Sequence, residues 1–390
     1  MSRLSRICAV RAVRAVSRVS GVSTVRADST VSAASELFRP LDPHGERKKV
    51  LYLLNLTKFH VYEQLLLEEC LYRMSSPLSQ GKNNVGFVLI NDTYSNAKEE
   101  ERGDGFTSTE NKCVVFGISG KVPNFIKDVN YVKKNKIALI RRYTGGGTVY
   151  VRNNCLMLSL ILPLNFEKER QLYPSNVTEW VFNSKKKKKR KKKKKTNSFF
   201  HHQNDYVYHR YDPVHDEITI KKVGGNAQAF SKNYFVHHTS FLWSCDYDEM
   251  ERVLVNPSKQ PQYRNKRNHK DFLTSLEECL PSGGHTPMGF ISKFVSNIRR
   301  LINQQNDKNN NGPFWQFNQI DLGIHRDSSI MQGGQIFDQV HSVDVDILKN
   351  LFRSFCSSEE TRNLRSARLL DPLGGVISDD AFSGPSFILR

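Results

Sequence analysis

The sequence feature that most constrains this chain is a run of three glycines, Gly145 to Gly147. The apolar residues 137–140 lead into Arg141 and Arg142, and a β-branched and aromatic segment follows the glycines. This order predicts a strand, a tight loop and a second strand. Glycine backbone N–H groups can approach a ligand closely, and a guanidinium can bind a carboxylate or phosphate. The loop favours an anionic, nucleotide-like ligand, although a solvated glycine-rich hairpin explains such a run when it stands alone.

Three further motifs follow in order: Asn204 with Asp205, a Lys-Val-Gly-Gly-Asn-Ala segment from Lys222, and a His-His-Thr-Ser-Phe-Leu segment from His237. Together with the glycine run they resemble the lipoate-protein ligase branch of the biotin/lipoate protein ligase family. The family pattern is Arg-Arg-x-Ser/Thr-Gly-Gly-Gly, Asn-Asp, Lys-Ile/Val-x-Gly-x-Ala and His-His-x-x-Leu/Phe-Leu. Weaker similarity extends from about residue 51 to about residue 304.

The resemblance implies an α+β fold, a mixed β-sheet flanked by helices, for a catalytic domain at residues 45–304. Within it, residues 184–203 are expected to be disordered, because their adjacent lysines repel one another and cannot bury apolar surface. Residues 305–390 are a C-terminal tail or small accessory region with one predicted helix and no assigned function. Apolar patterns predict strands at 50–54, 85–90, 113–118, 137–141, 155–162, 217–222 and 236–243, and helices at 59–74, 124–131, 247–255, 271–280, 290–302 and 343–355.

The formal charge of +19 does not imply a nucleic-acid partner. Residues 185–195 supply eleven positive charges and residues 1–40 a net of five, which leaves about three for the rest of the chain. No broad basic face follows, so no specific nucleic acid is expected. Seven scattered cysteines without a Cys-x-x-Cys pair favour free thiols in a reducing compartment. No apolar stretch approaches the length of a membrane span, so no membrane partner is expected either.

Residues 1–40 have the composition of a targeting segment. They hold seven arginines against two acids, with many serines and small apolar residues. Repeated Val-Arg-Ala-Val spacing can form a basic amphipathic helix, and the continuous apolar core of a secretory signal is missing. We therefore expect a mitochondrial targeting presequence, with a plastid transit peptide of similar composition as the alternative.

The resemblance assigns roles to individual side chains. Lys222 is the expected catalytic residue, whose ammonium contacts the carbonyl and phosphate oxygens of an acyl adenylate. Arg142 contacts the acyl or nucleotide portion, and Arg141 is the structural member of the pair. Asp205 is the candidate Mg²⁺ ligand, because a cation that bridges phosphates takes one or two carboxylates, although an Asn-Asp pair alone also fits a turn. The expected lipoyl-adenylate-binding residues are Arg142, Gly145, Gly146, Gly147, Thr148, Asn204, Asp205, Gly225, Asn226 and Ala227.

Two other groups of possible ligands or nucleophiles favour a structural interpretation. His237 and His238 are neighbours on a predicted strand, so their side chains point to opposite faces and do not easily bind one metal. We interpret them as core or pocket-edge histidines. Cys155 is adjacent to the expected site, but its apolar strand indicates a buried, inert thiol rather than a nucleophile.

The resemblance implies a lipoate-protein ligase or lipoyltransferase. Such an enzyme attaches lipoate, through a lipoyl-adenylate, to a lysine of lipoyl domains of 2-oxo-acid dehydrogenase acyltransferase subunits or of the glycine-cleavage H protein. Family members usually have His-Asp where this chain has Val151 and Arg152. If that pair takes part in activation, this protein performs only the second half-reaction and receives lipoyl-AMP from a separate lipoate-activating ligase. ATP and Mg²⁺ are implied only if the adenylation step is retained.

Several alternatives stay open from the sequence. An octanoyltransferase of the same fold would use an acyl carrier protein and no ATP, while the Lys-Val-Gly-Gly and His-His motifs argue against a biotin ligase. The missing His-Asp pair also allows a non-catalytic ligase-like protein that binds lipoyl domains. An RNA-associated protein could use the lysine run, but a tolerated loop expansion explains that run more simply. The acyl donor, the acceptor and the oligomeric state are not determined by the sequence.

Overall fold

The structure is a computed structural model that describes residues 48–379, apart from several internal segments. The expected presequence and the basic run at 184–196 lie outside the described residues. So do most of residues 95–112, whose polar composition predicts a surface loop. No helix in the described part of the chain has both the length and the apolar character of a membrane span. The internal residues left out are 58, 79–83, 94–111, 168–171, 175, 184–196, 281–285, 308–314, 322–341 and 358–364.

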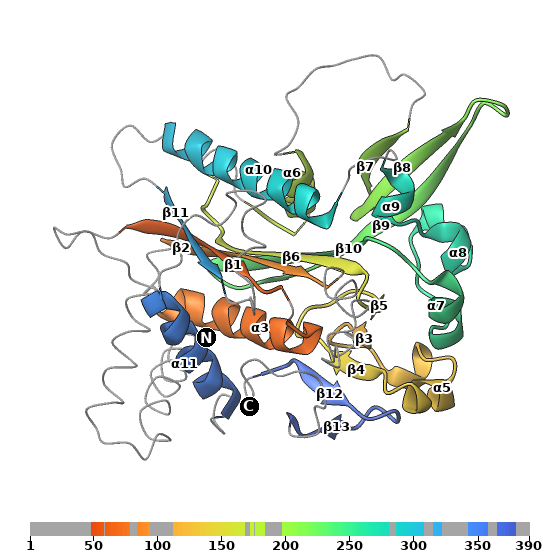
Figure 1. Ribbon diagram of the computed structural model, residues 1–390, viewed down its shortest axis with the longest axis horizontal. Helices are drawn as coiled ribbons and strands as arrows, with labels where there is room; N and C mark the ends of the chain where they lie inside the picture. The colour runs from red at the N-terminus through yellow and green to blue at the C-terminus, as the bar shows by residue number, and fades with distance from the viewer. Residues whose placement is uncertain are drawn as a thin grey trace, which may run out of the picture.

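A mixed eight-stranded sheet forms the centre of the molecule (Figure 1). Its strand order is β11-β1-β2-β6-β10-β9-β8-β7. β1 runs parallel to β11 and to β2, and the remaining neighbours pair antiparallel. The strands are β1 (Lys49–Asn55), β2 (Val85–Asp92), β6 (Cys155–Pro163), β7 (Ser198–His202), β8 (Asp205–Asp212), β9 (Glu217–Phe230), β10 (Tyr234–Leu242) and β11 (Trp315–Asp321).

A second, five-stranded sheet has the order β13-β12-β4-β3-β5. Its middle strands β3 and β4 run parallel, and the glycine loop connects β4 to β5. The strands on either side of the glycine loop therefore belong to the small sheet, whereas Lys222 belongs to the large one. The strands are β3 (Cys113–Phe116), β4 (Ala138–Arg141), β5 (Val149–Val151), β12 (Arg368–Leu370) and β13 (Val376–Ile377).

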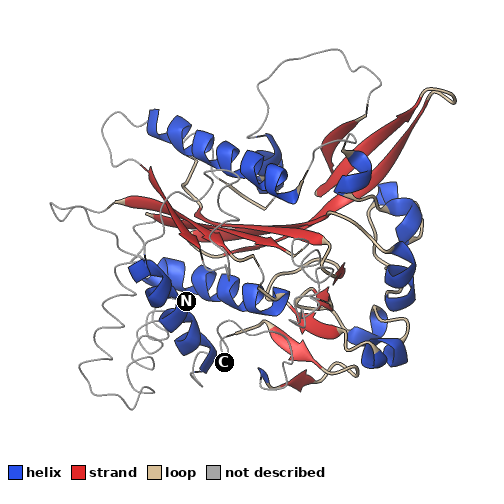
Figure 2. Ribbon diagram, in the orientation of Figure 1, coloured by secondary structure: helices blue, strands red, loops and turns tan. Residues whose placement is uncertain are grey.

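Helices cover both faces of the large sheet, as Figure 2 shows. The helix α3 (Val61–Leu78) lies on the same side as the small sheet, and α6 (Val177–Asn183) and α10 (Pro287–Asp307) cover the opposite face (Figure 1). The side chains of β1 alternate between two apolar clusters, because successive residues of a strand point to opposite faces. The remaining helices are α5 (Val129–Lys134), α7 (Tyr247–Val253), α8 (His269–Phe272), α9 (Leu276–Cys279), α11 (Ser342–Ser357) and the 3₁₀ turns η1 (Val122–Asn124) and η2 (Gln262–Arg264).

The α+β class is confirmed, and so are most of the predicted elements. The continuous helix predicted at 124–131 is wrong. Pro123 lies in the first turn of η1, and the Asp128 side chain caps a separate helix, α5, by accepting from the Tyr131 N–H. The helix predicted at 271–280 is likewise two short helices, because Ser275 begins α9 by accepting from the Glu278 N–H.

Three other expectations are corrected by the structure. Lys222 lies inside the long strand β9 rather than at a strand end. Disorder expected through residue 203 is wrong for β7, where Phe199 packs on Tyr208 with ring centroids 5.0 Å apart. The boundary expected at residue 304 falls within α10, and the strands β11, β12 and β13 complete the two sheets. The C-terminal residues thus belong to the same folded unit as the site.

Candidate functional site

The Arg142 side chain organises the glycine loop from within. Its Nη2 atom donates to the carbonyl oxygens of Gly145 at 2.7 Å and of Gly147 at 2.9 Å, and its Nε donates to Thr144 Oγ1 at 3.0 Å. Burial lowers the pKa of Arg142 to about 10, so the guanidinium stays charged at neutral pH. The loop turns through Gly146, whose φ of 99° lies in the region that favours glycine. Arg142 therefore both shapes this loop and contributes to the cavity beside it.

Gly117 is a site residue that sequence reasoning missed. It follows β3, and a Cβ at this position would collide with the Gly146 carbonyl oxygen. The neighbouring backbone is also joined to the loop, since the Ile118 N–H donates to the Thr144 carbonyl at 2.9 Å. A single glycine after an apolar strand gives no sequence signal of such a distant contact. Its absent side chain allows the loop to lie directly against the end of β3.

The Lys222 ammonium forms an ion pair with Asp205, with Nζ 2.8 Å from Oδ1. Asp205 begins β8 after a tight turn in which Gln203 and Asn204 have φ values of 47° and 67°. The pairing register shifts between Tyr206 and the next residue, opposite the part of β9 that carries Lys222. This irregularity brings the lysine and the carboxylate together. The Asn204 carbonyl accepts from Asn226 Nδ2 at 2.7 Å, which ties the turn to β9.

A cavity of about 90 Å³ lies between the glycine loop, β9, β10 and α3. Of the residues predicted to bind an acyl adenylate or to act in catalysis, Gly145, Gly146, Asn204 and Asp205 do not line it, and Asp205 reaches it only through Lys222. The predicted residues that line the cavity are Arg142, Gly147, Thr148, Lys222, Gly225, Asn226 and Ala227. The other lining residues are Gln64, Leu65, Val115, Val149, Met157, His238, Thr239 and Ser240.

A buried carboxylate, Glu68 of α3, supports one wall of this cavity. His238 Nδ1 lies 2.7 Å from Glu68 Oε1, the Tyr143 hydroxyl donates to the same oxygen at 2.6 Å, and the Ser159 hydroxyl donates to Oε2. Burial raises the pKa of Glu68, but the charge and hydrogen bonds of these partners outweigh it and leave the pKa below its usual value. His238 Nε2 is 3.1 Å from Thr144 Oγ1, so the network reaches the glycine loop.

The two histidines of β10 face opposite ways, as their spacing predicted. His238 lines the cavity, whereas His237 is buried on the other face. Burial lowers the pKa of His237 to about 3, so this ring is neutral at physiological pH. Cys155 is fully buried, and burial raises the pKa of its thiol well above the usual range. The predicted positions, in the core or at the pocket edge, are thus confirmed for these three residues.

The polar groups near Lys222 do not form a resident metal site by themselves. Both Asp205 oxygens are engaged, one by Lys222 and the other by the Tyr263 hydroxyl at 2.9 Å. Across the described residues, no group of three or more histidine, cysteine, aspartate or glutamate side chains is placed to hold a metal ion. A single, fully engaged carboxylate does not fit Mg²⁺ without oxygen ligands from a bound phosphate.

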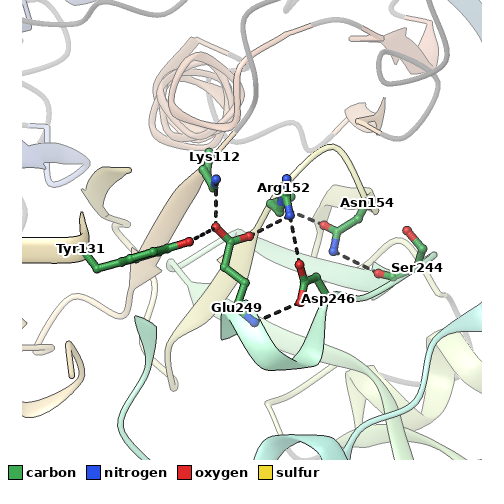
Figure 3. A network of polar contacts seen from close by, with 7 residues as sticks. All are labelled: Lys112, Tyr131, Arg152, Asn154, Ser244, Asp246 and Glu249. Carbon is green, nitrogen blue, oxygen red and sulfur yellow. Dashed lines mark hydrogen bonds and ion pairs between the residues drawn. The ribbon is translucent and has the colours of Figure 1, made fainter. Parts of the chain in front are cut away.

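Arg152, which with Val151 occupies the expected His-Asp position, does not line the cavity. Its side chain points toward Asp246 and Glu249 at the start of α7 (Figure 3). Its Nη1 atom lies 2.7 Å from Glu249 Oε2, and Lys112 Nζ lies 2.9 Å from Oε1 of the same carboxylate. The Tyr131 hydroxyl also donates to Glu249, at 2.9 Å. Burial raises the pKa of Glu249, but these donors outweigh burial and leave the pKa below its usual value. Arg152 therefore serves a structural network between β5, α5 and α7.

Comparison with known proteins agrees with this arrangement. Residues 93–299 match the model of the lipoyl protein ligase A/B catalytic domain. The chain is 41% identical over 384 residues to the inactive lipoate–protein ligase 2 of Plasmodium falciparum, covering 92% of this chain and 99% of that protein.

Two solved structures are also similar. One is a bipartite lipoate protein ligase from Thermoplasma acidophilum, described with its E2 lipoyl domain (17% identity, TM-score 0.46, 80% of this chain and 95% of that chain covered). Another is lipoate-protein ligase A bound with ATP (16% identity, TM-score 0.43, coverage 78% and 94%). The family match over residues 93–299 and the 41% identity across nearly the whole chain lead to one conclusion: this protein belongs to the lipoyl protein ligase A/B family.

Proposed function

We propose that this protein is a lipoyltransferase that moves a lipoyl group from lipoyl-AMP to the side-chain amine of a lysine on a lipoyl domain. The observation that carries this proposal is the position of the Lys222 ammonium. It lines one cavity together with Arg142 and the backbone of Gly147. A fixed positive charge beside a glycine loop suits a ligand that has both a phosphate and an acyl carbonyl.

For transfer from lipoyl-AMP, the protein has to position the two substrates and stabilise the negative charge that develops. The acceptor amine attacks the acyl carbonyl carbon, the new C–N bond forms, the C–O bond to the phosphate breaks, and AMP leaves while the nitrogen loses a proton. Negative charge develops on the carbonyl oxygen and on the departing phosphate. Lys222 would stabilise both charges, provided that its ammonium turns from Asp205 toward the ligand.

The rest of the cavity suits the acyl part of such a ligand. Leu65, Val115 and Met157 supply apolar surface for a carbon chain. His238 and Gln64 supply polar groups at the wall formed by α3 and β10, and their side chains are held by Glu68 and Asn91 respectively. The acyl chain would enter between the two sheets, with its nucleotide end toward Lys222.

Transfer from preformed lipoyl-AMP is favoured over a complete ligase reaction. The family's His-Asp pair is replaced by Val151 and Arg152, and Arg152 is engaged with Glu249 outside the cavity. Asp205 offers no free carboxylate oxygen for a metal that would accompany ATP. We therefore propose that a separate lipoate-activating ligase supplies lipoyl-AMP, so that this protein neither consumes ATP nor needs the Mg²⁺ that accompanies it.

The proposed acceptors are lipoyl domains of 2-oxo-acid dehydrogenase acyltransferase subunits and the glycine-cleavage H protein. Lipoyl domains are favoured because one structurally similar protein was described together with an E2 lipoyl domain.

The arginine-rich composition of residues 1–40 supports a mitochondrial location. Import of a fluorescent fusion of residues 1–40 into isolated mitochondria, with the arginines replaced by alanine as the control, tests this location.

Mass spectrometry of an apo lipoyl domain incubated with the purified protein tests the reaction. Lipoyl-AMP should give the mass increase of one lipoyl group, whereas lipoate with ATP and Mg²⁺ should give none. An increase in both reactions would identify a complete ligase. An increase only with octanoyl-charged acyl carrier protein would identify an octanoyltransferase instead. Lys222→Ala is the negative control, and Lys221→Ala is its matched variant because Lys221 does not line the cavity.

A non-catalytic lipoyl-domain-binding protein is the second candidate. It is favoured by the Lys222–Asp205 ion pair, which neutralises the expected catalytic charge, and by the similarity to a protein named an inactive ligase. This candidate predicts saturable binding of the apo lipoyl domain in a calorimeter. It also predicts no mass increase with any of the three donors, which separates it from the transferase.

A further inference from the structure

Tyr263 connects Lys222 to a chain segment that lies outside the two sheets. Tyr263 belongs to η2, and its hydroxyl donates to Asp205 Oδ2 at 2.9 Å. The other oxygen of Asp205 lies 2.8 Å from Lys222 Nζ. Three residues from η2, β8 and β9 thus form one continuous polar chain that ends at the cavity. The resemblance assigns individual roles to Lys222 and Asp205 but none to the Tyr263 side chain itself.

The chain around and after Tyr263 is also bonded to the β9 backbone, at Ile220 and at Lys222 itself. Arg267 Nη2 donates to the Ile220 carbonyl at 3.0 Å, and the Thr274 N–H donates to the Lys222 carbonyl at 2.9 Å. Asn265 and Lys266 hold φ values of 49° and 56°, which non-glycine residues adopt only when neighbouring contacts maintain them. The segment is therefore a tight turn fixed against β9 rather than a loosely attached loop.

The ring of Tyr263 is held as firmly as its hydroxyl. It packs against His202 and Phe272, with ring centroids 5.0 Å and 5.2 Å away. Burial raises the pKa of Tyr263, and the Asp205 charge raises it further, so the hydroxyl remains a proton donor at neutral pH. Asp205 thus has one oxygen fixed by a rigid aromatic group and the other paired with a flexible lysine stem.

We propose that Tyr263 is a positioning residue that anchors Asp205. When an acyl nucleotide binds, Lys222 then moves to the ligand while the Asp205 carboxylate stays in place. This inference deepens the transferase proposed above and rests on it. A ligand phosphate competes with Asp205 for the lysine ammonium. An unanchored carboxylate would follow the lysine toward the phosphate, where two like charges repel. The Tyr263 hydrogen bond keeps the carboxylate on β8 and leaves the phosphate to the ammonium.

Amine labelling of the ligand-free protein tests the anchor without any assumption about the reaction. Acetic anhydride is applied at limiting concentration, and acetylation at Lys222 is quantified by mass spectrometry relative to Lys221. Tyr263→Phe should lower this ratio roughly three- to tenfold, the value of one hydrogen bond, because an unanchored carboxylate follows the lysine and keeps it paired. Asp205→Asn should instead raise the ratio, because the ion pair is lost. Tyr211→Phe is the matched control, because it removes a Tyr–Asp hydrogen bond of 2.9 Å to the exposed Asp216 near the far end of the same hairpin.

Transfer kinetics then test the role toward the ligand. Tyr263→Phe should raise KM for lipoyl-AMP roughly three- to tenfold, with a smaller change in kcat. In the Asp205→Asn background the same substitution should change neither value, because its effect passes through Asp205. An equal loss in both backgrounds, or an unchanged Lys222 labelling ratio, would overturn the proposal. Tyr263→Met is made in parallel, so that a folding defect of one variant is recognised by circular dichroism and the other carries the test.

The two measurements separate this inference from the proposed function. If the wild-type protein transfers no lipoyl group, the transferase proposal fails. The labelling ratio still reports whether Tyr263 restrains Asp205 and Lys222, and an unchanged ratio overturns the anchor independently. If transfer occurs but Tyr263→Phe changes neither the labelling ratio nor KM, the anchor proposal is wrong and the transferase proposal is retained.

Discussion

Replacing Gly146 by alanine should destabilise the protein by about 1.5–3.5 kcal/mol. The backbone contribution comes from its φ of 99°, which costs an L-residue roughly 1–2 kcal/mol. The packing contribution comes from Arg142, because the new Cβ would lie 2.8 Å from its Nη2 atom. That atom donates to the Gly145 and Gly147 carbonyls, and weakening one such bond costs about 0.5–1.5 kcal/mol.

Gly145→Ala is the matched control within the same loop. A Cβ at Gly145 meets no atom within 4 Å, so the change in the free energy of unfolding should stay within about 0.5 kcal/mol. Urea unfolding followed by tryptophan fluorescence measures both variants, with the m-value as a check that the denatured state is unchanged. Gly117→Ala should be at least as destabilising as Gly146→Ala, because its Cβ would strike the Gly146 backbone.

The reasoning fails if Gly146→Ala and Gly145→Ala lose the same stability. It also fails if Gly146→Ala unfolds at the wild-type urea concentration, because neither the backbone strain nor the displacement of Arg142 would then be real. A crystal structure of Gly146→Ala with an unmoved guanidinium would contradict the packing part alone. The backbone part would survive that result.

Three further perturbations test the site and its supports. Lys222→Ala should slow single-turnover lipoyl transfer by about 10²- to 10³-fold with an unchanged circular dichroism spectrum. Lys221→Ala should leave the transfer rate unchanged. An unchanged transfer rate in Lys222→Ala would contradict the active-site assignment. Glu249→Gln should lower the free energy of unfolding by about 1–3 kcal/mol, because two cationic side chains lose their shared carboxylate. The control Asp248→Asn, at an exposed carboxylate, should change it by less than about 0.5 kcal/mol. Equal urea midpoints for the two variants would contradict this prediction. Burial lowers the pKa of His237 from 6.5 to about 3, so between these values the unfolded state binds a proton that the folded state excludes. Stability should therefore fall on acidification below pH 6.5 by up to about 1.4 kcal/mol per pH unit from this residue; His237→Gln should have a correspondingly shallower slope in urea titrations, and identical slopes would refute the assignment.

Much of the large sheet could be predicted because its central strands are buried on both faces. Runs such as residues 50–54 and 155–162 are almost wholly apolar, and both became strands. The helix expected at 124–131 was wrong because apolar spacing outweighed Pro123 and the capping residue Asp128, which divide that segment. The strands β12 and β13 have three and two residues, too few to show a period, so neither the pairing of β12 with β4 nor that of β13 with β12 gives a local signal.

The site was predictable only where one continuous motif supplies the contact. The arginine, glycines and lysine of the cavity come from two such motifs and their adjacent residues. The Glu68–His238 contact joins residues 170 positions apart, and Gly117 touches a loop on another strand. The bond of Tyr263 to Asp205 depends on where the chain around η2 folds against β9. Long-range contacts of this kind are set by the tertiary fold rather than by local spacing.

The pairing of β1 with β11 and of β4 with β12 determines when the protein can finish folding during its synthesis. Lys49 pairs with Trp315, and Arg141, next to the glycine loop, pairs with Arg368. A nascent chain that has reached residue 304 has made every cavity residue but still exposes the edges of both sheets. Open edges recruit strands from other molecules, and such distant pairings form slowly. The growing chain therefore passes through a long interval in which its binding residues exist, its sheets are incomplete, and a chaperone has two defined edges to shield.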